Sequence, residues 1–473
     1  MPTSVPTSAS NGDLPETGLQ GEVSLADQLS GRSLLGYRRG LKLIGQNTIG
    51  NRGANLQLAW SGNCAYVGQA QASRFFPGVD TTPPTYPAGE VSSYGIAVID
   101  ATDDTNPALL HILQSPATYN MWEALHTNTA RNFLAVSGTS TKLDLYDITD
   151  CKNPTLLSDT TLPATSHGML ISPDGNTVYI ADLYGSQIEV VDVSNLRAPK
   201  LMMLVPEPGA HDLDISDDGT RVYLAAPGNG VLVIDVSSIQ NRSPNPTAKT
   251  IGKLPWPELS HTARRMQNGG RTYLMDSDGV NGTGMDRFGH SFGTGLGPPS
   301  DDVGTCPWGF GRIVDITSET NPALVSTYGL QVNDAVNCPT TIKDVESESY
   351  QLVNYSPHYG GFDNKENAEL AFWTWYSSGL RVFNISNPAD PVEIAYYNPP
   401  PIPTVTNNEF ILGPSPLLYD YSTSYTRYMP SNGDIWFVSE QNGFQILRLT
   451  NTAGPKTYPQ ARPLFGAPRR RRS

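Results

Sequence analysis

Residues 231–237 read VLVIDVS, and close variants of this heptapeptide recur along the whole chain. Most variants place an Asp or Asn after an apolar run and a Ser or Thr two residues later. The other copies are residues 96–102 (IAVIDAT), 143–149 (LDLYDIT), 188–194 (IEVVDVS), 311–317 (GRIVDIT), 380–386 (LRVFNIS) and 444–450 (FQILRLT). In five copies a proline follows the Asp or Asn by seven residues: Pro107, Pro154, Pro199, Pro322 and Pro391. Regular self-similarity of this kind is typical of a repeat architecture.

Each repeat unit has the pattern of an antiparallel sheet. The β-branched run of the heptapeptide predicts a strand, which the following Asp and proline end in a turn. A second strand precedes it after a tight turn such as residues 172–175 (SPDG), and a third apolar run such as residues 200–205 (KLMMLV) follows. Units of about four strands predict an all-β fold, a seven-bladed β-propeller. Residues 40–45 (GLKLIG) resemble an outer strand without a unit, so we expect this N-terminal strand to complete the last blade.

The repeats resemble those of LVIVD-repeat β-propeller proteins over residues 40–450. The expected organisation is a flexible N-terminal arm over residues 1–36, a single propeller over residues 37–455 and a C-terminal tail over residues 456–473. The resemblance implies the fold and no single activity. Propellers of this general kind serve in fungal and bacterial secondary metabolism, where the hetero-Diels–Alderases of tropolone sesquiterpenoid pathways provide the nearest analogy.

Composition excludes several classes of partner. The formal net charge of −14 argues against a nucleic-acid surface, because phosphate binding needs a basic face. No apolar run approaches the roughly 20 residues of a membrane span. The N-terminus lacks the pattern of a secretory signal, so the protein is expected to be cytoplasmic unless a leader was removed, in which case it is secreted. The oligomeric state stays open.

Repeat phase places the long insertions on one face. If the inner strand of each blade starts at the top, then residues 69–94, 276–310, 331–357 and 398–423 all connect strands on the top face. Long loops are usually functional, which makes the top the expected binding face. The same phase brings Cys306 near Cys338 on the top and Cys64 near Cys151 on the bottom. These pairs are disulfide candidates, and four reduced thiols are the alternative.

Four histidines occupy a recurring position, each twelve residues before the middle of a second strand: His167, His211, His261 and His358. The same position holds Trp122 in the second unit, Ala54 or a neighbour in the first, and a residue near Ser424 in the last. Because the position begins an innermost strand, the four imidazoles are expected to meet at the top mouth of the central channel.

Three interpretations of this histidine cluster are open. The imidazoles could bond neighbouring backbone and have only a structural role. They could line a pocket for an apolar or aromatic small molecule, together with Trp122, Arg264, Tyr359 and the loop residue Trp308. They could instead bind iron, copper or zinc, since the arrangement is similar to the metal centres of carotenoid-oxygenase and selenium-binding propellers. Asp212, beside His211, is one candidate to orient such ligands.

The leading functional hypothesis is a cofactor-independent cyclase of the hetero-Diels–Alderase type, acting on an apolar natural-product intermediate. His167, His211, His261 and His358 would be its catalytic residues, with donors that polarise a carbonyl while the pocket holds the reacting groups in near-attack geometry. The alternatives are a metal-dependent oxidoreductase that uses the same four histidines as ligands, and a noncatalytic interaction scaffold.

Overall fold

The protein is described by a computed structural model of the 473-residue chain. The described residues are 12–70, 94–119, 121–138, 141–163, 165–183, 185–207, 209–256, 259–279, 308–346, 353–406, 409–410 and 413–450.

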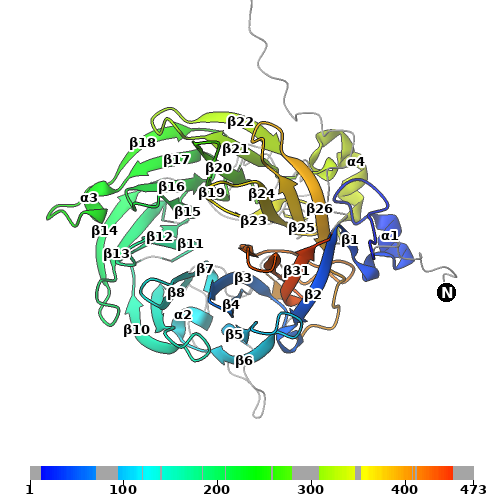
Figure 1. Ribbon diagram of the computed structural model, residues 1–473, viewed down its shortest axis with the longest axis horizontal. Helices are drawn as coiled ribbons and strands as arrows, with labels where there is room; N and C mark the ends of the chain where they lie inside the picture. The colour runs from blue at the N-terminus through cyan, green and yellow to red at the C-terminus, as the bar shows by residue number, and fades with distance from the viewer. Residues whose placement is uncertain are drawn as a thin grey trace, which may run out of the picture.

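Seven antiparallel sheets stand around a common axis as the blades of a β-propeller, which confirms the predicted fold (Figure 1). We call the region around this axis the central channel. Blade 1 consists of β3 (Asn55–Ser61), β4 (Cys64–Gln69), β5 (Ile96–Asp100) and β6 (Ala108–Leu113), and blade 2 of β7 (Met121–Asn128), β8 (Phe133–Gly138), β9 (Lys142–Asp147) and β10 (Thr155–Thr161). Blade 3 consists of β11 (Gly168–Ile171), β12 (Thr177–Asp182), β13 (Gln187–Asp192) and β14 (Lys200–Pro206), and blade 4 of β15 (Asp212–Ile215), β16 (Arg221–Ala226), β17 (Gly230–Asp235) and β18 (Lys249–Leu254).

Blades 5 to 7 complete the ring. Blade 5 consists of β19 (Thr262–Asn268), β20 (Arg271–Ser277), β21 (Gly311–Asp315) and β22 (Ala323–Tyr328). Blade 6 consists of β23 (Pro357–Phe362), β24 (Leu370–Trp375), β25 (Gly379–Asn384), β26 (Val392–Asn398) and β1 (Tyr37–Arg39). Blade 7 consists of β29 (Arg427–Met429), β30 (Asp434–Ser439), β31 (Gly443–Leu449) and β2 (Leu41–Asn47). The first strand named for each blade is the innermost one. A separate short hairpin pairs β27 (Glu409–Phe410) with β28 (Gly413–Pro414).

In six of the seven blades an Asp or Asn caps the turn that ends the third strand. In blade 3, the Asp192 carboxylate accepts a hydrogen bond of 2.9 Å from the backbone N–H of Ser194. The same bond, from the residue two places later, recurs at Asp100, Asp147, Asp235, Asp315 and Asn384. The Asp-x-Ser/Thr pattern of the sequence is therefore a local turn motif.

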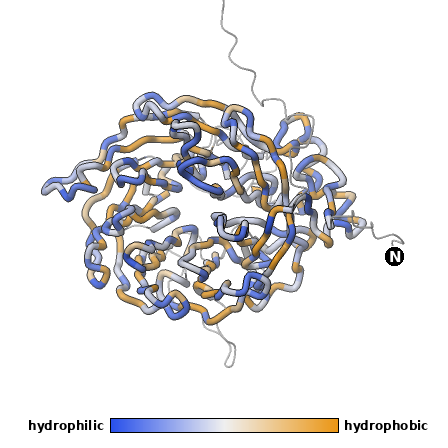
Figure 2. The backbone as a smooth tube through the Cα atoms, viewed as in Figure 1, coloured by the Kyte–Doolittle hydropathy of each residue, from blue (hydrophilic) through white to orange (hydrophobic). Residues whose placement is uncertain are grey.

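The strands are apolar on both faces because each sheet packs between two others. Val190 of β13 belongs to the core between blades 3 and 4, whereas its neighbour Val191 belongs to the core between blades 2 and 3. Seven such apolar clusters fill the seven spaces between adjacent blades. Figure 2 shows hydrophobic strand segments all around the ring, with hydrophilic segments at many of the turns.

The N-terminal strand closes the ring as predicted. β2 pairs antiparallel with β31, from Leu41 opposite Leu449 to Asn47 opposite Phe444, and so becomes the outer strand of blade 7. The sequence did not predict β1, which adds a fifth strand to blade 6 by pairing with β26. The same N-terminal segment therefore covers the outer edges of blades 6 and 7.

Part of the expected N-terminal arm packs against blade 6. Helix α1 (Leu25–Ser30) begins after the N-cap Ser24 and ends at Gly31, whose positive φ suits glycine. The buried guanidinium of Arg381 pairs with Glu16 of this segment and with Glu393. The expected flexible arm therefore contains a packed part from residue 12 to residue 36.

The other short helices are α2 (Pro116–Tyr119), α3 (Ser237–Gln240), α4 (Cys338–Thr341), η1 (Ser33–Leu35), η2 (Ile49–Asn51), η4 (Gln331–Asn333), η5 (Ala335–Asn337) and η6 (Ile342–Asp344).

The predicted bottom-face disulfide is present. Cys64 and Cys151 are bonded, with a Cα–Cα distance of 5.9 Å, and join blade 1 to blade 2. Cys338 is also disulfide-bonded, whereas its candidate partner Cys306 lies outside the described residues. Within the described ranges, no helix is long and apolar enough to cross a membrane.

Candidate functional site

The sheet register defines one equivalent position at the top of every inner strand. In blade 3, Tyr179 of the second strand pairs with Leu170 of the inner strand, and His167 lies three residues before Leu170. The equivalent residues of the other blades follow from the same pairing. We call the seven residues the mouth positions: Leu56, Glu123, His167, His211, His261, His358 and Ser424. All are buried, and the most exposed side chain, His167, is only 5% accessible.

The structure brings the four predicted histidines together. The ring centroids of His167 and His211 are 3.9 Å apart, those of His211 and His261 4.0 Å, and those of His261 and His358 4.4 Å. Backbone hydrogen bonds to the second strand fix three of these residues, for example from the N–H of His167 to the carbonyl of Ala181 at 2.8 Å. Neighbouring blades therefore present their imidazoles to one common region.

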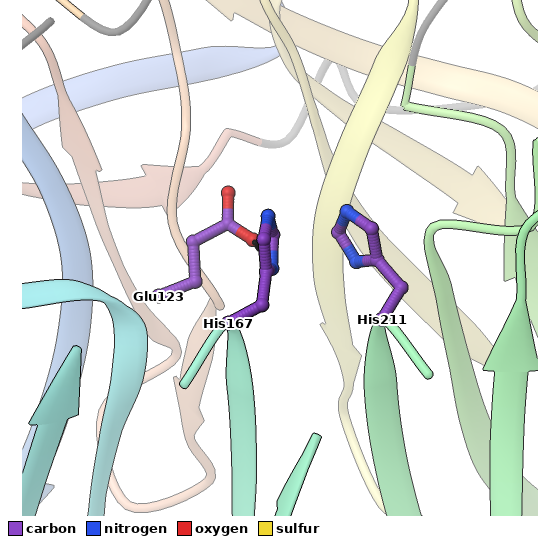
Figure 3. Close-up of side chains that lie close together, drawn as sticks. All are labelled: Glu123, His167 and His211. Atoms are coloured by element: carbon purple, nitrogen blue, oxygen red, sulfur yellow. Dashed lines mark ion pairs between the residues drawn. The ribbon is translucent and has the colours of Figure 1, made fainter. Parts of the chain in front are cut away.

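The mouth position of blade 2 is Glu123, not Trp122 as counted from the sequence. Its carboxylate lies among the histidines, as Figure 3 shows for Glu123, His167 and His211. Oε1 of Glu123 is 2.9 Å from Nε2 of His358, and Oε2 accepts a hydrogen bond from the Tyr359 hydroxyl at 2.5 Å. Oε2 also lies 3.3 Å from Nδ1 of His167 and 3.8 Å from Nε2 of His261. Glu123 is thus a central member of the cluster that sequence analysis missed.

Trp122 has a different role in the cluster. Its indole N–H donates a 2.7 Å hydrogen bond to Nε2 of His167. Because this nitrogen accepts, the proton of a neutral His167 ring lies on Nδ1, the atom that faces Glu123. Trp122 therefore sets the tautomer of His167 and orients its donor towards the carboxylate.

The electrostatics of the cluster favour the ionised form of Glu123 and the neutral forms of His167, His211 and His261. Burial opposes the ionisation of Glu123, but attraction by His167 and His358 and the hydrogen bonds it accepts outweigh that effect and lower its pKa. Burial lowers the pKa of His167 to about 4 and depresses the pKa values of His211 and His261 well below the ordinary value. In these three rings Nδ1 has no hydrogen-bond partner.

An aromatic cluster covers the same end of the channel. The Tyr376 ring lies 4.5 Å from the His358 ring and 5.4 Å from the ring of Tyr421. Trp122, Tyr376 and Tyr421 share one apolar cluster with Val353 and Tyr419, which come from two of the long insertions. The described ends of those insertions therefore place apolar surface next to the polar cluster.

The remaining predicted binding residues lie elsewhere. Arg264 lies three residues below the mouth position of blade 5, where its guanidinium stacks 4.7 Å from the Tyr425 ring. Trp308 is fully buried and packs edge-on against Tyr355 in the core between blades 5 and 6. Asp212, the candidate orienting residue, accepts hydrogen bonds from Tyr425 and Thr262. The only substrate-binding candidates that contact Glu123 or the histidines directly are Trp122 and Tyr359 among the described residues.

Comparison with known proteins agrees with this fold. The LVIVD repeat pattern matches residues 169–205, which span nearly all of blade 3. A chain of hydrazine synthase from Kuenenia stuttgartiensis superposes with a TM-score of 0.51 at 12% identity, covering 84% of this chain and 96% of that chain. A protein from Lactobacillus plantarum gives a TM-score of 0.45 at 12% identity, covering 70% and 80% of the two chains. No curated protein matches the sequence.

The seven blades define the protein as a β-propeller, and one of them, blade 3, matches the LVIVD repeat. At 12% identity, the structural likeness to hydrazine synthase shows a shared fold and carries no activity across.

Proposed function

We propose that this propeller is an enzyme that acts on an apolar or aromatic small molecule at the mouth of its channel, and that the reaction is a cyclisation of the hetero-Diels–Alder type. The observation that carries the proposal is Glu123, a buried carboxylate in contact with imidazoles and a phenol beneath an aromatic cluster. Buried polar groups that converge next to apolar surface are typical of small-molecule sites.

The chemistry of such a cyclisation suits these residues. A [4+2] addition between a heterodiene and an alkene forms two σ bonds from π electrons, and it neither gains nor loses atoms. The protein must hold the two partners in near-attack geometry and stabilise charge that develops on the heteroatom. The aromatic side chains of Tyr376, Tyr421 and Trp122 provide contact surface, and an imidazole N–H of the cluster provides the donor.

The ionised Glu123 organises these donors. Its carboxylate accepts hydrogen bonds from Tyr359 and lies near the Nδ1–H of His167, so the acidic protons of the cluster point towards one acceptor. The Nδ1 atoms of His211 and His261 have no partner and are the groups able to bond a substrate heteroatom. Glu123 therefore positions the donor groups of the cluster, and His211 or His261 donates a hydrogen bond to the substrate.

Incubation of the purified protein with polyene and quinone-methide substrates, in the presence of a chelator, tests the cyclase. The expected result is accelerated formation of one stereoisomer over the uncatalysed mixture. No acceleration with any substrate, together with partner-protein binding that survives His211→Ala and His358→Ala, would instead establish the noncatalytic scaffold.

A metal-dependent oxidoreductase is the second candidate function. The observation that favours it is the carboxylate of Glu123 among several imidazole nitrogens, a ligand combination that suits iron, copper and zinc. Turnover that is lost with chelator and restored by one of these ions would support the oxidoreductase over the metal-free cyclase.

A further inference from the structure

The contacts of His358 direct its Nε2 at the carboxylate of Glu123. Nδ1 of His358 lies 2.5 Å from the carbonyl oxygen of Thr423, which can only accept, so Nδ1 carries the ring proton. In the neutral ring Nε2 then has a lone pair, and this atom is 2.9 Å from Oε1 of Glu123. Either a second ring proton on Nε2 or a metal ion between the two atoms would remove the repulsion between this lone pair and the carboxylate oxygen.

The arrangement of His358 is the one found for metal ligands. A ligating histidine almost always donates its second N–H to a carbonyl or carboxylate, which fixes the ring and directs the other nitrogen at the ion. The Thr423 carbonyl does this for His358, and the position of Thr423 is itself fixed by a hydrogen bond from its N–H to Val438.

The spacing of the donor atoms also fits one ion. Glu123, His261 and His358 each offer an atom within 4.8 Å of the other two. Ligand bonds of about 2.1 Å place two neighbouring ligands about 3.0 Å apart at right angles and about 3.4 Å apart at the tetrahedral angle. Oε1 of Glu123 lies 2.9 Å from Nε2 of His358 and Oε2 lies 3.8 Å from Nε2 of His261, so small side-chain shifts would bring the carboxylate and both imidazoles to an ion.

The cluster supplies a negative charge that pairs with no Lys or Arg of the described ranges. Among the described residues, every ion pair of Glu123 is with a histidine. A buried carboxylate is costly unless a cation or hydrogen bonds compensate it, and a dication would do so.

We propose that Glu123, His261 and His358 bind one divalent first-row transition-metal ion of the iron, copper or zinc class. Two imidazoles and one carboxylate leave further coordination positions open, and His211, whose ring lies 4.0 Å from that of His261, offers an additional donor. His167 is a positioning residue, because its Nε2 is occupied by Trp122. The inference rests on the second candidate function, because a metal ion at this cluster would favour the oxidoreductase over the metal-free cyclase.

Titration of chelator-treated full-length protein with Co²⁺, followed by its visible absorption and by calorimetry, tests the site. One Co²⁺ per chain is expected, with affinity lowered at least about tenfold in Trp122→Phe and stoichiometric binding lost in Glu123→Gln and His261→Gln. His111→Gln, on outer strand β6, is the matched control and should bind as the wild type does. Absence of stoichiometric binding, or equal binding by Glu123→Gln and His261→Gln, would overturn the proposal and leave a shared proton as the cation.

Two further measurements keep the test independent of folding and of catalysis. Circular dichroism establishes that each variant is folded, and anomalous diffraction at the cobalt edge from wild-type crystals should place the ion beside Glu123; a peak elsewhere contradicts the site. Because Co²⁺ binding is measured without substrate, its failure leaves the cyclisation assay unaffected, and a failed cyclisation leaves the metal result intact.

Discussion

Glu123 of blade 2 and His358 of blade 6 meet across the mouth of the channel, with 2.9 Å between Oε1 and Nε2 although 235 positions separate them in the sequence. The contact links two blades that are not neighbours in the ring and do not belong to the same sheet. Glu123 therefore contributes to the stability of the ring as well as to the chemistry proposed for its mouth.

Removal of the Glu123 carboxylate should destabilise the fold. Glu123→Ala leaves the Tyr359 hydroxyl and Nε2 of His358 buried without their partner, which is expected to cost about 3–5 kcal/mol of unfolding free energy. Glu123→Gln keeps an acceptor for Tyr359 and should cost less. Urea denaturation of chelator-treated protein measures both values; equal stability of Glu123→Ala and the wild type would contradict the role of Glu123 as a link between blades.

Trp122→Phe should remove the preference of His167 for one tautomer while the aromatic packing remains. Loss of the indole hydrogen bond is expected to cost about 1 kcal/mol of stability. With Nε2 released, the His167 resonances in a nitrogen-15 histidine spectrum should change from one tautomer to a mixture. An unchanged spectrum would show that Trp122 does not set the tautomer.

The Cys64–Cys151 disulfide should stabilise the junction of blades 1 and 2. It spans 87 positions, so the double substitution Cys64→Ala and Cys151→Ala is expected to lower the free energy of unfolding by about 2–4 kcal/mol. Urea denaturation without reductant gives this difference. If the double variant matches the wild type, the link adds no stability.

Glu440 should make the protein less stable as the pH rises. Burial, together with the charge of Asp420, raises the pKa of Glu440 to about 8 from an ordinary value of 4.5. Between these values the folded state holds more protons than the unfolded state, so this contribution to stability is complete below pH 4.5 and is lost as the pH rises through 8.

Glu440→Gln is the matched test of this pH dependence. Glutamine keeps an oxygen that can accept the hydrogen bonds from the Ala54 N–H and the Ser415 hydroxyl, but it does not ionise. Thermal midpoints measured from pH 5 to pH 9 should fall more steeply for the wild type than for the variant. Parallel curves would mean that Glu440 does not titrate in this range.

Local sequence patterns were sufficient for the fold. The repeated Asp caps a turn within two residues, so that turn could be predicted. Residues 40–45 match the outer strand that the last repeat unit lacks, so the closure of blade 7 could be predicted as well. β1 could not, because Tyr37–Arg39 is a three-residue strand with two arginines and no repeat partner. Its place depends on tertiary packing against β26.

The candidate site was predicted only in part. Spacing found four histidines, and the same twelve-residue interval before Ala135 leads to Glu123 once the register of blade 2 is known. In blades 5 and 6 the register gives an interval of fourteen residues, from His261 to Met275 and from His358 to Phe372, because the hairpins of the first and second strands are longer. Contacts across the channel, such as that of Glu123 with Tyr359, follow from ring closure and leave no periodic signal.

The rate of cyclisation by Glu123→Gln, on a substrate that the wild type converts, tests the central role of the mouth cluster most directly. Loss of a positioned electrostatic group is expected to slow the reaction about 100-fold or more. His111→Gln, far from the channel, should keep the wild-type rate. A Glu123→Gln rate equal to that of the wild type would contradict the assignment of catalysis to this cluster.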